Sequence, residues 1–129
     1  MKYMIMTFGS AEAGIEAMGR EWMREMVQFM HGLDKDLRES GELVDDHGLA
    51  DGSQAKTVRF QNGIPVATDG PFAESKESLV GYWIVDVESP EQAYAIAARA
   101  SAAPGKGGVP MNMPIEVRQV MSGPPEEFV

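Results

Sequence analysis

The chain of 129 residues contains no cysteine. Disulfide bonds, thiolate nucleophiles and cysteine-ligated metal centres are therefore excluded. Long apolar runs are also missing: none approaches the about 18 residues of a membrane-spanning helix, and the apolar character of the first ten residues is too short for a secretory signal. We therefore expect a cytosolic protein with no membrane partner.

Positive charge is scarce. Lys and Arg number 11 against 20 Asp and Glu, which gives a formal net charge of −9. This charge repels phosphate backbones, so we expect no nucleic-acid partner. The chain also lacks the GxGxxG, P-loop, GxSxG and HExxH patterns, so nothing indicates a nucleotide, a phosphate ligand or a known hydrolase mechanism. We accordingly expect no cofactor.

Apolar spacing predicts the secondary structure that is present. A long helix is expected over 11–40, where apolar side chains recur at helical spacing: Met18, Trp22, Met26, Phe29, Leu33 and Leu37. This face is wide enough either to pack broadly on a sheet or to meet a second subunit or line a cavity. A second helix is expected over 90–100, because Ser89 and Pro90 form a typical helix start. Strands are expected over 2–8, 42–47, 56–61, 64–68, 79–87 and 115–121.

The order of these elements predicts an α+β fold, a ferredoxin-like sandwich with two helices on one antiparallel sheet. Asn62-Gly63 predicts a type I′ hairpin, and Val58 and Phe60 alternate with polar residues as in a half-buried strand. The central strand 79–87 is apolar on both faces, so we expect a homodimer that covers the second face. One domain is expected over 1–121, followed by a tail over 122–129.

Residues 68–105, TDGPFAESKESLVGYWIVDVESPEQAYAIAARASAAPG, resemble the DGPF-domain proteins of the YCII-related family. The likeness extends from the first strand to Met121 and implies a ferredoxin-like fold that dimerises as an α+β barrel. Most members have no assigned reaction, and one branch resembles a dehydrochlorinase. Some relatives are thought to use a His–Asp pair, whose histidine would fall at Met30 here, one position from His31. Others occur beside extracytoplasmic-function sigma factors, which implies a sigma-factor-type partner as one possibility.

Asp69 is the leading candidate for a catalytic group, because it stands at a strand end before the Gly70-Pro71 corner. It is either a general base or a cap that accepts from the backbone N–H groups of Phe72 and Ala73. The candidate helpers are His31 and His47. Asp45, Asp46 and His47 are consecutive residues of a strand and cannot all point one way, so we expect no metal site.

The candidate ligand-binding residues flank the same corner and the central strand: Phe72, Glu74, Lys76, Tyr82 and Trp83. Phe72 fills either the core or a pocket wall, and Glu74 and Lys76 lie either in solvent or in a pocket. Tyr82 and Trp83 alternate, so one faces the helices and the other faces the second side of the sheet.

Two functions follow from these residues. The first is a non-catalytic module that binds a small organic ligand or a regulatory protein partner. The second is a lyase or isomerase that works by acid–base chemistry without a cofactor, with Asp69 as the base.

Overall fold

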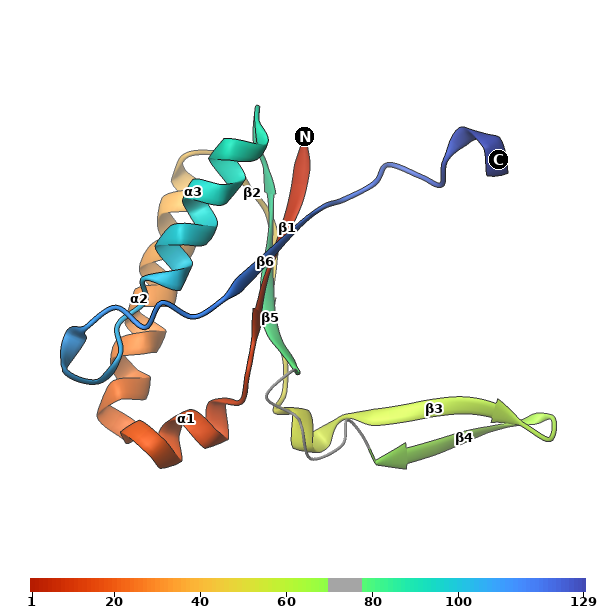
Figure 1. Ribbon diagram of the computed structural model, residues 1–129, viewed down its shortest axis with the longest axis horizontal. Coiled ribbons are helices and arrows are strands. Elements are labelled where there is room, and N and C mark those ends of the chain that lie inside the picture. The colour runs from red at the N-terminus through yellow and green to blue at the C-terminus, as the bar shows by residue number, and fades with distance from the viewer. Residues whose placement is uncertain (70–77) are drawn as a thin grey trace.

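The computed structural model describes residues 1–69 and 78–129 (Figure 1). Short 3₁₀ turns lie at Gly52–Gln54, Lys106–Gly108 and Glu126–Phe128. The strands and helices, in chain order, are β1 (Lys2–Phe8), α1 (Ala11–Met18), α2 (Arg20–Glu39), β2 (Leu43–Gly48), β3 (Lys56–Gln61), β4 (Ile64–Asp69), β5 (Leu79–Asp86), α3 (Pro90–Ser101) and β6 (Ile115–Gln119).

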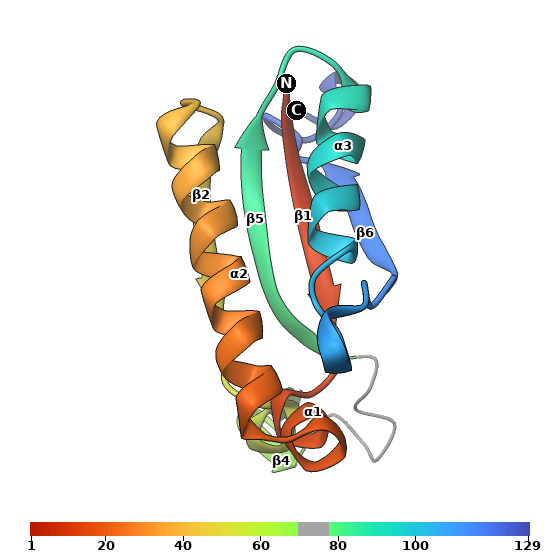
Figure 2. The same cartoon turned by 90° about the vertical axis from the view of Figure 1, so that its left-hand side faces the viewer.

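Four of these strands form the main sheet, in the spatial order β2-β5-β1-β6. Each neighbouring pair is antiparallel. Helices α2 and α3 cover one face of the sheet, with α2 beside β2 and α3 beside β1 and β6 (Figure 2). This arrangement confirms the predicted ferredoxin-like α+β sandwich.

The helix expected over 11–40 is divided in two at Gly19, so its prediction as one continuous helix is wrong. Gly19 has φ 91° and its N–H donates to the carbonyl oxygen of Ile15 at 2.7 Å, which closes α1. Glycine adopts such a positive φ at little cost because it has no Cβ. At the other end of α1, the Ser10 hydroxyl accepts from the Ala13 N–H at 3.1 Å. The break turns α1 across the lower end of the sheet (Figure 1).

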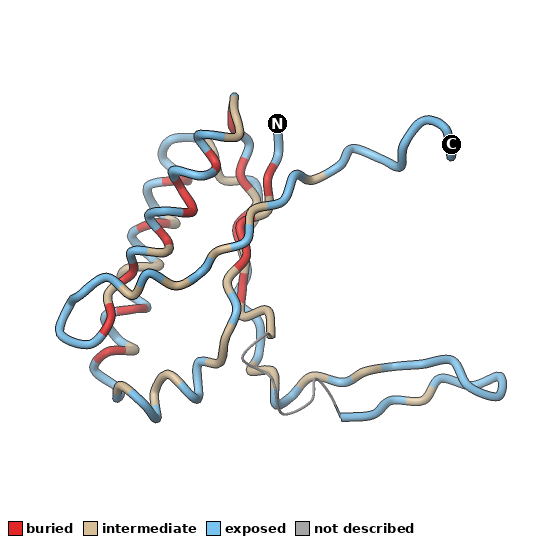
Figure 3. Tube along the Cα trace, in the orientation of Figure 1, coloured by how far each residue is buried: buried red, intermediate tan, exposed pale blue. Residues whose placement is uncertain are grey.

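The core lies between the helices and the sheet (Figure 3). Central strand β5 contributes Trp83 and Val85, and β1 contributes Tyr3 and Ile5. The helices contribute the apolar positions that their spacing predicts: Trp22, Met26, Leu33 and Leu37 from α2, and Ala93, Ile96, Ala97 and Ala100 from α3. In the part of the chain that the structure describes, no helix combines the length and the apolar character needed to cross a membrane.

Strands β3 and β4 form a hairpin that stands apart from the main sheet (Figure 1). Its turn is as predicted, with φ 52° at Asn62 and 82° at Gly63. The prediction of a half-buried strand is wrong, because Val58 is 62% exposed and Phe60 is 80% exposed. The alternation of the sequence is present, but no other element of the described chain packs on the apolar side of this hairpin.

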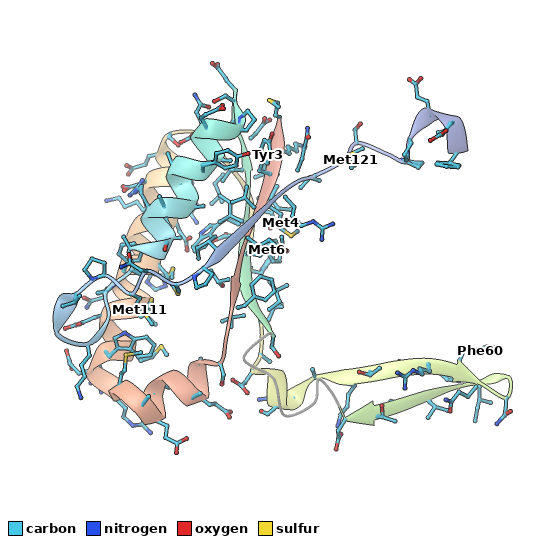
Figure 4. All side chains as sticks on the ribbon, viewed as in Figure 1. Tyr3, Met4, Met6, Phe60, Met111 and Met121 are labelled. Atoms are coloured by element: carbon cyan, nitrogen blue, oxygen red, sulfur yellow. The ribbon has the colours of Figure 1, made fainter. Side chains whose placement is uncertain are left out.

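The second face of the main sheet carries no helix. Met4 and Met6 of β1 project to this side, whereas Tyr3 points toward α3 (Figure 4). Tyr82 and Ile84 of β5 share that side, because they lie directly across from Met6 and Met4. We call these four residues the open face. The hairpin and the C-terminal tail extend from the sheet on this side (Figure 1).

Candidate functional site

A cavity of about 390 Å³ lies between α1, α2 and the adjoining ends of β1, β2 and β5. Its volume is within the range of small-molecule sites. Methionine supplies much of the cavity wall. Its side chain is flexible and polarisable, so the wall adapts to ligands of different shape. Six of the ten methionines and both tryptophans of the chain line it: Met18, Met23, Met26, Met30, Met111, Met113, Trp22 and Trp83.

The wall near α1 is shaped by a glycine and a tryptophan. A Cβ on Gly14 would lie 2.7 Å from the ring of Trp22, so only glycine allows α1 to approach this ring as it does. The ring is fixed because Trp22 Nε1 donates to the carbonyl oxygen of Pro104 at 2.9 Å. Helix α1 and the segment after α3 are thus both held against the start of α2.

The segment 102–114, which joins α3 to β6, supplies the last part of the wall. The N–H of Met111 donates to the carbonyl oxygen of Ala103 at 2.9 Å. The Ser101 hydroxyl donates to the carbonyl oxygen of Met113 at 2.7 Å. These two bonds hold Met111 and Met113 at the cavity.

Two carboxyl groups meet at the polar end of the cavity, Asp34 from α2 and Asp46 from β2. Trp83 Nε1 donates to Asp34 Oδ1 at 2.6 Å. Burial raises the pKa of Asp46, and its hydrogen bond with Asp34 and the charge of Asp34 raise it further. The charges of Arg38 and His47 lower that pKa in part. Two carboxyl groups this close resist ionising together, so Asp46 binds its proton more tightly than an isolated carboxyl group does.

A second polar cluster lies on the opposite side of the sheet. Tyr82 Oη donates to Asp45 Oδ2 at 3.1 Å. His47 Nε2 lies 3.1 Å from Asp45 Oδ1, and the rings of His47 and Tyr82 meet edge to face at 6.1 Å. Burial, followed by the bond to Asp45, raises the pKa of Tyr82. Asp46, directly across from Trp83, faces the helices instead, so the three consecutive residues 45–47 divide between the two faces.

Residues 1–115 match the YCII-related domain. The chain belongs to the YCII-related family. A relative from Rhizobium meliloti (strain 1021) is 28% identical over 103 residues, which cover 80% of this chain and 82% of the relative. That relative is described as uncharacterized. Membership of the YCII-related family confirms the resemblance seen in the sequence and leaves the activity to be argued from the cavity.

In this YCII-related protein the candidate residue Asp69 lies at the end of β4, outside the cavity wall. Its exposed carboxylate pairs with Lys56, and the hydrogen bond and charge of Lys56 lower its pKa. A carboxylate whose pKa is lowered is a weaker base. The backbone donors proposed for its cap, at Phe72 and Ala73, lie outside the described residues. The catalytic role of Asp69 stays a prediction.

The other candidate residues are placed as follows. His31 is exposed on α2 and is not part of the cavity wall, whereas its neighbour Met30 is. Trp83, Tyr82 and His47 all line the cavity. Trp83 lies on the side of the sheet that faces the helices, and Tyr82 and His47 occupy paired positions whose side chains lie on the other side. Phe72, Glu74 and Lys76 lie outside the described residues. The roles assigned to all of these residues stay predictions.

Sequence reasoning missed Asp34 and considered Asp46 only as part of a metal cluster. A signal for Asp34 was present in the spacing of α2. It follows Met30 by four residues, so it continues an apolar row of the helix with a carboxylate. A charged residue within an apolar row of a helix indicates a polar group that lies inside an otherwise apolar site.

Proposed function

We propose that this YCII-related protein binds a small, mostly apolar organic molecule in the cavity between α1, α2 and the sheet. The observation that carries the proposal is the wall itself: a cavity of about 390 Å³ lined by six methionines and both tryptophans, with one pair of carboxyl groups at one end. An apolar ligand would bury its surface against these side chains, at about 25 cal/mol for each Å² removed from water. The carboxyl pair would orient the polar end of that ligand.

Binding can be followed without a dye, because both tryptophans of the chain line the cavity. Titration with 1-octanol is expected to shift tryptophan emission saturably, with one site by calorimetry. The variant Ala11→Phe places a ring at the cavity wall and is expected to weaken binding at least about tenfold, or about 1.4 kcal/mol. Ala13→Phe, on the same helix but outside the wall, is the matched control and should bind as the parent does. Equal weakening by both variants, or no saturable binding, would contradict this site.

The polar end of the cavity favours a second candidate function, a lyase or isomerase that uses acid–base chemistry without a cofactor. The specific observation is that the pKa of Asp46 is raised, first by burial and then by Asp34. A carboxyl group whose pKa moves toward neutrality transfers protons more effectively than an ordinary one. We propose Asp46 for the catalytic role that the sequence suggested for Asp69.

We also propose that two copies of the chain associate through the open face of the sheet. The open face presents Met4, Met6, Tyr82 and Ile84 without a covering layer, and the hairpin extends beside it with Phe60 exposed (Figure 4). Met6 is 8% exposed and the other three residues are half-buried, whereas Phe60 is 80% exposed. An apolar patch of this kind is typical of an interface. A regulatory protein, such as a sigma-class factor, is the alternative occupant of the same face.

The association is tested by the mass of the particle in solution. Light scattering is expected to give twice the 14.0 kDa of one chain. Ile84→Glu is expected to reduce the mass to that of one chain, because a dimer would bury two unpaired carboxylates there. Tyr94→Glu, on the exposed side of α3, is the control and should remain a dimer. A parent protein of single-chain mass would instead favour the alternative occupant.

A further inference from the structure

We infer that the ligand of the cavity is a lipophilic amine, an apolar body with a protonated amino group that binds between Asp34 and Asp46. This inference rests on the proposed function, because it names the chemical class of ligand for the same cavity. It is carried by the acidic side chains of the wall and by the bond from Trp83 that holds Asp34.

The ionisable side chains that line the wall are the two acids Asp34 and Asp46, together with His47 and Tyr82. Asp34 and Asp46 come from two different elements, one from α2 and the other from β2. Among residues 1–69 and 78–129, no lysine or arginine lines the cavity. A ligand with a carboxylate or phosphate would therefore meet two acids and no cation, whereas an ammonium group would meet complementary charge. The net charge of −9 also raises the local concentration of cations.

The bond from Trp83 holds Asp34 as an acceptor. The indole N–H only donates, so the oxygen of Asp34 that it contacts at 2.6 Å must accept. That bond fixes the carboxylate of Asp34 at the cavity wall and beside Asp46. An ammonium group has three donors, so it can reach both carboxyl groups at once. The apolar body of the amine would then lie along the methionines and the ring of Trp22.

The charge around Asp46 explains why a cation is favoured over a neutral ligand. On α2 the facing groups are Asp34, which raises the pKa of Asp46, and Arg38, which lowers it; on β2 His47 lowers it. From β5 the facing residue is Trp83, which does not titrate. Burial is the largest cause and also raises this pKa. The net effect is that Asp46 binds a proton more readily than an ordinary aspartate does.

An ammonium group can replace that proton, so amine binding and proton binding compete. The carboxyl pair holds a proton below the pKa of Asp46 and is ionised above it. The amine stays positive over this range because an alkyl ammonium group has a pKa of about 10. Affinity for the amine is therefore expected to fall as the pH is lowered through the pKa of Asp46. Arg38 is not part of the wall.

Three probes of equal chain length test the inference on the intact protein: octylamine, 1-octanol and octanoate, measured by calorimetry. Octylamine is expected to bind at least about tenfold more tightly than 1-octanol at pH 7, and octanoate is expected to bind most weakly. Asp46→Asn is expected to remove most of the preference for the amine, so that the affinities of this variant for octylamine and 1-octanol become similar. The decline of octylamine affinity between pH 7 and pH 4 is expected to be lost in this variant.

Asp45→Asn is the matched control, because it removes the same charge from the adjacent residue on the other side of the sheet. It should keep the full preference for octylamine, which separates the cavity from general attraction by an acidic protein. Equal affinities for octylamine and 1-octanol, or an unchanged preference in Asp46→Asn, would overturn the amine inference and leave the proposed function standing. Failure of all three probes to bind would overturn both.

Discussion

Replacing Trp83 with alanine is expected to lower the free energy of unfolding by about 3–5 kcal/mol. Trp83 is 6% exposed and belongs to the cluster of residues between the helices and the sheet. Its removal leaves a large void and deprives Asp34 of its indole donor. Domains of this size have a total stability of about 5–15 kcal/mol, so the variant is expected to be only marginally folded.

Urea unfolding followed by circular dichroism measures this loss. Trp83→Phe keeps an aromatic ring but removes the N–H that donates to Asp34. It is expected to lower the free energy of unfolding by about 1–3 kcal/mol, the usual penalty for leaving a partly buried polar group without its partner. Tyr82→Ala removes a ring from the adjacent position on the open face and is expected to cost about 1 kcal/mol, the centre of the range for ordinary substitutions. If Trp83→Ala is no more destabilising than Tyr82→Ala, the assignment of Trp83 to the core is contradicted.

Gly81→Ala is expected to cost about 1–3 kcal/mol, because it overpacks a position where two strands approach closely. A Cβ at Gly81 would lie 2.9 Å from the carbonyl oxygen of His47 and 3.3 Å from Cα of Gly48. Both atoms belong to the backbone of β2, so neither can rotate away. The contact between the new Cβ and this backbone is relieved only if β2 moves away from β5. Asp46, which lies on β2, would move with the strand. Weaker binding of 1-octanol is therefore expected together with the loss of stability.

Gly32→Ala is the control for this substitution. Gly32 lies within α2, and a Cβ there would have nothing within 4 Å. Alanine is favoured over glycine in a helix by about 0.5–1 kcal/mol, so this variant is expected to be more stable than the parent. Thermal unfolding of the two variants should therefore shift in opposite directions. A stabilising Gly81→Ala would contradict the close approach of β2 and β5.

Much of the fold could be predicted because it depends on local pattern. The alternation of Tyr82 and Trp83 predicts that the two rings lie on opposite sides of the sheet, since side chains of a strand alternate between faces. It does not decide which of the two faces the helices. Asn62-Gly63 determines the hairpin turn, since both positions need positive φ. The helix start at Ser89 and the buried alanines of α3 follow from capping and helical spacing in the same way.

The candidate site could not be predicted, because it depends on which distant residues meet. Asp34 and Asp46 are twelve positions apart on different elements, and only the packing of α2 on β2 brings their carboxyl groups together. The exposure of Val58 and Phe60 has a related cause. Alternation shows that one side of a hairpin is suited to burial, but it does not show whether the same chain supplies the cover. The DGPF corner at 69–72 lies mostly outside the described residues.

The division of residues 45–47 between the two sides of β2 has a consequence for how this strand can vary. Because side-chain direction alternates strictly, sliding β2 by one residue along β5 would turn Asp45 and His47 inward and Asp46 outward. The imidazole of His47 would then face the helices, and Asp45 would no longer accept the hydrogen bond from Tyr82 on the outer side. The number of residues that join α2 to β2 thus determines the acid–base character of both sides of the sheet together.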